Sequence, residues 1–546
     1  MARSVPLRSL RRVIKAALLT ERQDGSAADA LDVIEEQTSI MESRVISRRQ
    51  FLAGAGATGA TLAMGTMAGF PRQAGAKPLP SSLSVGIVGA GLAGLVCADT
   101  LKAQGIRASL YEAAAHAGGR CSSLRGFFPG QVAERGGELI DNLHKTMLGY
   151  AQRFGLIVED VNKEPGEVFY HFAGQRYPET AIVNEFRDFV SVMRTDLSRL
   201  SRAVTATSHT PDDVTLDRTN LLAYLEGQNG AGMKAGPLAK AAIIAAYEGE
   251  YGLTADEQSA LNLLLFIHPD RRSEFTPFGI SDERYHLVGG NDLIVEGLIG
   301  ELPGQILYGN RLMRVRKISD GRIELTFQQG ARTVTFSHDA AVLAIPFTTL
   351  RHVDLDSSLG VPPAQHATIQ NLGYGSNAKT MVGFSSRPWL ALGGNGTSYS
   401  DLAHLQTTWE TNPALGSATR GILTDYSSGP RATRLDPNAV QANTQQFLQD
   451  LNRLYPGAWG AAALVQGRYL AHLEHWPSNQ LMKGSYTCYR PGQFTTMAGL
   501  EGVPVGNLLF AGEHANSFYE WQGFMEGAAL SGITAAQSIL TMAKAH

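Results

Sequence analysis

The chain has 546 residues, 44% of them hydrophobic, which is enough to bury a large core and predicts about two to four domains. Its formal charge of −3 comes from interspersed residues of both signs, so the composition excludes the basic footprint of a nucleic-acid-binding protein. The three cysteines form no CxxC pair, which argues against a disulfide framework and against a zinc site.

The N-terminal segment carries an export pattern. Arg48 and Arg49 precede a weakly apolar run that is too short and too rich in glycine to span a membrane stably. The pattern resembles a twin-arginine export signal with a cleavage site at residues 74–76 (AGA). This resemblance implies that residues 1–76 are removed, that the mature protein is periplasmic or secreted, and that it holds a prosthetic group tightly before export. A disordered basic leader is the alternative.

A nucleotide-binding unit is predicted next. Residues 83–88 form a short apolar run, residues 89–94 (GAGLAG) follow at once, and residues 95–105 have the apolar spacing of a helix. A second strand at residues 108–113 completes a strand, glycine turn, helix and strand of Rossmann type.

Three glycines and one carboxylate of this unit suit a dinucleotide. Gly89 allows the tight bend, Gly91 lets the backbone approach a pyrophosphate, and Gly94 lets the helix pack close to its strand. The pyrophosphate would face the helix N-terminus, where free N–H groups favour anions. Glu112, near the end of the second strand, can accept hydrogen bonds from ribose hydroxyls.

A second glycine turn, with an arginine, follows at residues 118–120 (GGR), and Gly119 and Arg120 suit a further diphosphate contact. Together with the first unit, it resembles the FAD-binding N-terminus of the flavin amine oxidase family. The segment 133–138 (AERGGE) is similar to the family's paired-glycine segment, which implies that Gly137 and Glu138 contact the isoalloxazine.

Two further segments just past the middle of the chain add to the resemblance. Residues 288–290 (VGG) resemble the family's second glycine pair. Val315, in a predicted hairpin, stands where the family's backbone contact to adenine falls.

The resemblance continues in the C-terminal third of the chain. Lys379, between apolar neighbours, resembles the family's flavin-side lysine, which holds a water near the flavin N5. Trp476 precedes Ser485 by nine residues, and residues 484–487 (GSYT) follow the pattern in which monoamine oxidases have Gly-Cys-Tyr-Thr. Because serine replaces the cysteine that those enzymes bond to the flavin, the resemblance implies non-covalent FAD. Tyr486 matches one wall of the family's aromatic cage.

The last segment supplies the other side of the predicted site. Residues 510–514 (FAGEH) resemble the form found in polyamine oxidases, which implies that Glu513 contacts the ribityl chain and that Gly512 also belongs to the cofactor site. Phe524 matches the second cage aromatic, and Trp521 beside it is either a further wall or core packing. The N–H groups of the helix that begins near Met525 would face the flavin pyrimidine and stabilise negative charge there.

The expected fold is α/β: a discontinuous, Rossmann-like FAD-binding domain with an inserted substrate-binding domain of mixed sheet and helices. The interval 150–265 reads as mostly helical. Strands are expected at residues 311–318 and 322–327 (a hairpin), 340–346 and 508–514. The predicted FAD-binding segments are 83–150, 285–345 and 475–546, and the predicted substrate-binding segments are 151–284 and 346–474.

The resemblance implies an FAD-dependent oxidase that converts an amine C–N bond to an imine and reduces oxygen to hydrogen peroxide. The expected substrates are small amines or amino acids, with an L-amino acid oxidase favoured, releasing ammonia and a 2-oxo acid. Arg284 is a candidate anchor for a substrate carboxylate, whereas Glu138 and Asp141 would attract a second positive charge in a diamine, a polyamine or a basic amino acid. A monoamine or polyamine oxidase is therefore the alternative.

Other classes fit less well. A flavin-dependent desaturase or isomerase of the phytoene-desaturase type would share the N-terminal fingerprint but has no need of Lys379 or of the pair Tyr486 and Phe524. Two histidines at 472 and 475 lack a third ligand cluster, so no metal is expected. No nucleic acid and no stable membrane span are expected, and a homodimer is one candidate for the oligomeric state.

Overall fold

A computed structural model describes residues 83–161, 166–267, 283–413 and 419–545. The predicted export signal and its cleavage site lie outside these residues. No helix in the described ranges combines the length and the hydropathy that a membrane crossing requires.

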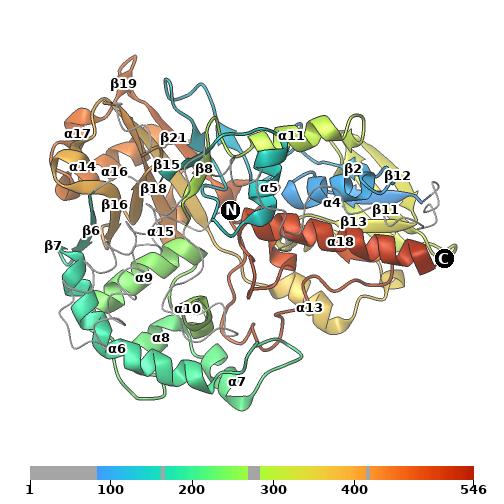
Figure 1. Ribbon diagram of the computed structural model, residues 1–546, viewed down its shortest axis with the longest axis horizontal. Coiled ribbons are helices and arrows are strands. Elements are labelled where there is room, and N and C mark those ends of the chain that lie inside the picture. The colour runs from blue at the N-terminus through green and yellow to red at the C-terminus, as the bar shows by residue number, and fades with distance from the viewer. Residues whose placement is uncertain (1–82, 162–165, 268–282, 414–418, 546) are drawn as a thin grey trace, which may run out of the picture.

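A five-stranded parallel sheet forms the nucleotide-binding side of the molecule (Figure 1). All four pairs of neighbouring strands are parallel. Its central strands consist of small and β-branched apolar residues and are buried on both faces, as a parallel sheet requires. In spatial order the strands are β22 (Leu508–Phe510), β13 (Ala340–Leu343), β1 (Val85–Val88), β2 (Ser109–Tyr111) and β9 (Ile306–Leu307).

Helices α4 (Leu92–Lys102) and α18 (Met525–Ala545) pack against each other beside this sheet (Figure 1). The two helices lie so close that a Cβ atom at Gly532 would be only 2.2 Å from the carbonyl oxygen of Ala93, so glycine is needed at this position. The first helix of the described chain therefore contacts its last.

A four-stranded sheet packs against the nucleotide-binding sheet, with Tyr111 stacked on Phe327 at 4.4 Å between ring centroids. The predicted hairpin is confirmed as the antiparallel pair of β10 (Arg311–Lys317) and β11 (Ile323–Gln329). The sheet is completed by β12 (Arg332–His338) and β14 (Asp354–Leu355).

A seven-stranded sheet forms the other side of the molecule (Figure 1). Its pairs are antiparallel except β16 with β6. Helix α16 (Val440–Leu454) contributes to the apolar cluster on one face. The strand order is β21 (Ala471–His475), β15 (Asn377–Phe384), β18 (Gly421–Ser428), β17 (Thr407–Glu410), β16 (Gly394–Ser400), β6 (Glu167–Phe172) and β7 (Gln175–Tyr177).

A group of helices lies below this sheet in Figure 1 and confirms most of the helical expectation for residues 150–265. The group consists of α6 (Glu179–Arg199), α7 (Pro211–Arg218), α8 (Leu221–Leu225), α9 (Pro237–Tyr251) and α10 (Ala260–Ile267). The expectation is wrong for β5 (Val158–Asp160), β6 and β7: β5 and β6 are stabilised by pairing with residues far along the chain, and β7 pairs with β6. For example, β6 pairs with β16.

Shorter elements connect the three sheets. The helices are α5 (Lys145–Arg153), α11 (Leu293–Glu301), α12 (Phe347–Leu350), α13 (Pro363–Asn371), α14 (Pro388–Ala391), α15 (Gly429–Arg434) and α17 (Ala458–Ala461). The strands are β3 (Ser123–Leu124), β4 (Ala133–Glu134), β8 (Tyr285–Leu287), β19 (Leu464–Val465) and β20 (Arg468–Tyr469), and the 3-10 turns are η2 (Ser357–Leu359), η3 (Trp476–Ser478) and η4 (Glu513–Ala515). The α/β fold class is confirmed, while the domain boundaries stay a prediction.

Candidate cofactor cleft and active site

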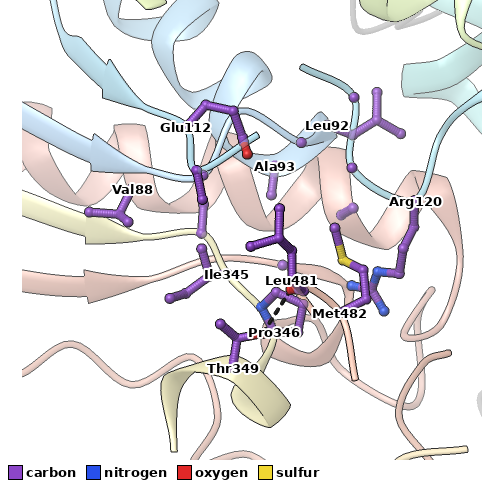
Figure 2. A pocket seen from close by; sticks show the side chains of 18 of the residues that line it. Val88, Leu92, Ala93, Glu112, Arg120, Ile345, Pro346, Thr349, Leu481 and Met482 are labelled. Atoms are coloured by element: carbon purple, nitrogen blue, oxygen red, sulfur yellow. Dashed lines mark hydrogen bonds between the residues drawn. The ribbon is translucent and has the colours of Figure 1, made fainter. Parts of the chain in front are cut away.

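A cleft opens where β1 and β13 end and α4 begins (Figure 2). Ligands of doubly wound sheets bind at this edge, beyond the carboxyl ends of the strands. The lining includes the predicted cofactor residues Gly89, Gly91, Glu112, Gly119, Arg120, Gly512, Glu513 and Met525. The structure therefore brings residues from both ends of the chain to one cleft.

The first glycine turn has the shape that a pyrophosphate needs. Gly89 has a φ of +100°, and a Cβ atom there would lie 2.5 Å from the carbonyl oxygen of Ala344. A Cβ at Gly94 would lie 1.9 Å from the carbonyl oxygen of Gly89, so the helix packs directly on the turn. At Gly91 the nearest atom would be 3.9 Å away, and the residue lines the cleft. The turn therefore exposes backbone, not side chain, to a ligand.

The carboxylate of Glu112 is held at the cleft by two backbone donors. Its Oε2 accepts from the Ala90 N–H at 2.8 Å and its Oε1 from the Ala114 N–H at 2.7 Å. Asn310 lines the same part of the cleft. This arrangement fixes an acceptor where the ribose of a dinucleotide would lie.

Arg120 and Glu513 form an ion pair that joins three segments around the cleft. The guanidinium donates to Glu513 Oε1 at 2.9 Å and to the Ser485 carbonyl at 2.5 Å, while Glu513 Oε2 accepts from the Gly523 N–H at 3.0 Å. Burial raises the pKa of Glu513, but the charge of Arg120 and these hydrogen bonds outweigh burial and hold that pKa below its usual value. Glu513 is therefore ionised at neutral pH.

The paired-glycine segment lies against the start of α18. A Cβ atom at Gly137 would lie 2.5 Å from the Met525 Sδ, so a larger residue there would require the Met525 side chain to move. Trp476 donates from Nε1 to the Arg135 carbonyl at 3.2 Å and packs against Tyr486. These contacts fix the segment between the cleft and the seven-stranded sheet.

The adenine contact predicted at Val315 falls on a residue buried within the four-stranded sheet, where its carbonyl accepts from the Asp356 N–H at 3.0 Å. The β10 residues that line the cleft are Arg311 and Leu312. Sequence spacing locates the strand, but the register that turns Leu312 toward the cleft comes from its pairing with Phe327.

Lys379 is buried on β15 and donates to three acceptors of the paired-glycine segment. They are the Glu134 carbonyl at 3.0 Å, the Gly136 carbonyl at 2.8 Å and the Glu138 carboxylate at 2.5 Å. Glu138, predicted to contact cofactor or substrate, is therefore also the counter-ion of Lys379.

Tyr486 and Phe524, the predicted cage walls, are both buried and make separate contacts. The Tyr486 hydroxyl donates to the Glu250 carbonyl and lies 3.1 Å from the Tyr426 hydroxyl. Phe524 packs edge-on against Trp521 at 5.6 Å between ring centroids. In the structure the Trp521 ring contacts the Phe524 ring, and the Tyr426 hydroxyl contacts the Tyr486 hydroxyl.

Arg284, the candidate carboxylate anchor, is bonded to Asp160. Its Nη2 and Nε lie 2.5 and 3.1 Å from one carboxylate oxygen. The charge of Arg284 is therefore largely compensated within the protein.

Three side chains at this site carry no sequence signal of their own: Trp409, Tyr426 and His144. Trp409 donates from Nε1 to Glu138 Oε1 at 3.2 Å, and its ring lies 5.4 Å from that of Tyr426. The His144 ring lies 4.6 Å from Trp521 and accepts at Nδ1 from the Asp141 N–H at 3.0 Å. Burial lowers the pKa of His144 to about 3, so the ring is neutral. Only sheet register and helix packing bring these residues to the site.

Comparison with known proteins agrees with this geometry. The family model for flavin-containing amine oxidoreductases matches residues 92–540, and that for the twin-arginine translocation signal matches residues 45–65. A putative L-amino-acid oxidase, YobN, of Bacillus subtilis is 27% identical over 83% of this chain and 94% of its own. The L-amino-acid oxidase of Pseudechis australis is 21% identical over 83% of this chain and 86% of its own.

Two solved structures share the fold. Cyclohexylamine oxidase from Brevibacterium oxydans superposes with a TM-score of 0.70 at 19% identity, covering 84% of this chain and 99% of its own. Putrescine oxidase bound to putrescine superposes with a TM-score of 0.69 at 19% identity and the same coverage. The family match spans most of the chain, and the cleft has the glycine cradle and ribose acceptor that a flavin dinucleotide needs, so this chain belongs to the flavin-containing amine oxidoreductases and carries a twin-arginine export signal.

Proposed function

We propose that this protein is an exported L-amino acid oxidase that uses non-covalent FAD, converts its substrate through an imine to a 2-oxo acid and ammonia, and reduces oxygen to hydrogen peroxide. The observation that carries the oxidase reaction is the meeting of Lys379, Tyr486 and the paired-glycine segment beside the cleft. The choice of amino acids rests on the relatives, several of which are named L-amino-acid oxidases.

When bound, FAD would take up the hydrogen and two electrons from the carbon next to the substrate nitrogen and pass them to oxygen. The protein's own residues bind and orient. In the proposed site the glycine turn, Glu112 and Arg120 hold the dinucleotide, and the N-terminus of α18 at Met525 faces the flavin. Tyr486 and Phe524 wall an apolar space that favours an uncharged amine.

The non-covalent link is proposed because residue 485 is a serine, whose buried hydroxyl donates to Asn377. We expect acid precipitation of the purified protein to leave the flavin in the supernatant. Flavin that stays with the pellet would contradict the proposal.

A diamine or polyamine is the second candidate substrate class. Arg284, the residue expected to bind a substrate carboxylate, forms an ion pair with Asp160 instead. One solved structure of the same fold is a putrescine oxidase bound to putrescine.

A peroxide assay of the purified holoenzyme separates these candidates. We expect the enzyme to release peroxide faster with L-amino acids than with putrescine or with a monoamine such as cyclohexylamine. Peroxide only with the diamine would favour the second candidate, and a flavin-loaded protein that makes no peroxide with any amine would contradict both.

From the export signal we propose a periplasmic or secreted location. A homodimer stays a separate proposal for the oligomeric state. Fractionation of the producing cell tests the first, and sedimentation of the mature holoenzyme tests the second. A cytoplasmic holoenzyme or a monomer would contradict them.

A further inference from the structure

Four residues share one face of the seven-stranded sheet, and two of them, Lys379 and Trp409, contact the paired-glycine segment. Lys379 on β15 lies opposite Tyr426 on β18, and Thr424, two residues earlier on the same strand, lies opposite Trp409 on β17. Because cross-strand partners share a face and alternate residues of a strand share a face, these side chains all point the same way. Register alone therefore places the indole of Trp409 beside the ammonium of Lys379, 5.8 Å from it.

The ammonium of Lys379 uses all of its hydrogen-bonding capacity within the protein. A lysine ammonium has three N–H donors, and its three acceptors belong to Glu134, Gly136 and Glu138. It can turn a donor toward a water at the flavin only by giving up one of these bonds. Its orientation therefore depends on how firmly each acceptor is held.

Glu138 is held from its other side by Trp409. One carboxylate oxygen accepts from Lys379 and the other accepts from the indole Nε1 at 3.2 Å. All three side chains are at least nine-tenths buried, so water does not substitute for either bond.

We propose that Trp409 is a positioning residue of the active site: through Glu138 it fixes Lys379, and with it the paired-glycine segment that lies along the flavin. The inference rests on the proposed placement of the flavin along Gly136 and Gly137, and it does not depend on which amine is oxidised. Loss of the indole N–H should free one end of the Glu138 carboxylate and loosen the segment without altering its sequence.

The same strand supplies a matched control. Glu410 follows Trp409 and therefore points to the opposite face of the sheet. There it accepts from the indole Nε1 of Trp389 at 2.9 Å and pairs with Arg387 at 2.6 Å, in an apolar cluster on the far face. Trp389→Phe thus deletes the same kind of bond, from a buried indole to a buried ion pair, on the face turned away from Lys379.

The test compares Trp409→Phe with Trp389→Phe in the mature holoenzyme. We expect Trp409→Phe to weaken FAD binding about tenfold, the change that one lost hydrogen bond to a charged group can cause, and to shift the visible absorption bands of the bound flavin. Trp389→Phe should lower the thermal unfolding midpoint by a similar amount to Trp409→Phe and leave FAD affinity and absorption unchanged.

Glu138→Gln tests whether Trp409 acts on Lys379 through Glu138. If Trp409→Phe does not fold, the FAD affinity and flavin absorption of Glu138→Gln alone are measured in its place. Lys379 and Trp409 donate to different oxygens of Glu138, and a glutamine replaces one of these oxygens by an NH2 donor, so one of the two bonds is lost in place. Trp409→Phe should therefore change FAD affinity less in a Glu138→Gln background than in the wild type. Unchanged flavin absorption and affinity in Trp409→Phe, or equal effects in both backgrounds, would overturn the proposal. These readouts need no substrate, so they are independent of the amine assay.

Discussion

Glu501 is a buried carboxyl below the segment that carries the predicted cage aromatics. It accepts from the Tyr489 hydroxyl and from the Gly499 N–H at 2.7 Å. The amide of Gln522 donates both to the Tyr489 hydroxyl and to the His514 carbonyl, at 3.1 and 3.0 Å. Burial raises the pKa of Glu501 to about 7 from an ordinary value of 4.5. The carboxyl is therefore poised to titrate near neutrality, and the Tyr489 hydroxyl links it to Gln522.

This raised pKa predicts a pH-dependent stability. The folded protein holds the Glu501 proton more tightly than the unfolded chain, so the stabilisation is complete below pH 4.5 and is lost as the pH rises through 7. Glu501→Gln should remove this slope. Between pH 4.5 and 7 we expect the unfolding free energy of the wild type to fall relative to that of the variant by about 3 kcal/mol, measured by urea denaturation. Parallel curves would show that Glu501 is already ionised in the fold.

Tyr486 allows its ring and its hydroxyl to be tested separately. Tyr486→Phe keeps the predicted cage wall and removes the bonds to Glu250 and Tyr426, so it should cost about 1 kcal/mol of stability and leave kcat/KM within a few-fold. Tyr486→Ala removes the wall and should lower kcat/KM at least tenfold, measured as peroxide release. A cage role is contradicted if Tyr486→Ala keeps the wild-type kcat/KM while still holding FAD.

At the scale of the element, local chemistry made the nucleotide-binding unit predictable from sequence. A Cβ atom at position 94 would meet the carbonyl of residue 89, only five residues away, and a Cβ atom at position 89 would meet the end of the neighbouring strand. By contrast, β6 and β7 were missed because β6 pairs with β16, far along the chain, and β7 is held at the sheet edge only through its pairing with β6. Trp409 and Tyr426 were missed for a related reason, since only the register of three antiparallel strands brings them to Lys379.

The contact between the turn and α4 yields a sharp test. In Gly94→Ala the added methyl would meet the Gly89 carbonyl at 1.9 Å, so helix and turn must separate and the cradle must open. We expect the purified variant to lose most of its FAD, measured as the ratio of flavin to protein absorbance.

Gly149→Ala is the matched control, because Gly149 lies in α5 with no atom within 4 Å of the added methyl. That variant should keep its FAD and gain up to about 1 kcal/mol of stability from helix propensity. Equal flavin content in the two variants would show that the cradle tolerates a side chain.

At the scale of the whole molecule, the export signal and the cleft together predict that the protein folds and binds its flavin before it is exported. The matched signal contains Arg48 and Arg49, which a twin-arginine receptor reads as an address. We expect replacement of both by lysine to leave a flavin-loaded protein inside the cell, detected by fractionation and flavin fluorescence. Export of the double variant at the normal level would mean that another signal directs it.

The packing of α18 on α4 also sets the point at which this protein can first take up its flavin. Residues 88–93 form one wall of the cleft, and Gly512, Glu513 and Met525 form another. A growing chain on the ribosome lacks the second wall for nearly the whole of its synthesis. Completion of the binding site therefore waits for the start of the final helix, and a chain that ends before Met525 would leave the ribosome without this wall of the cleft.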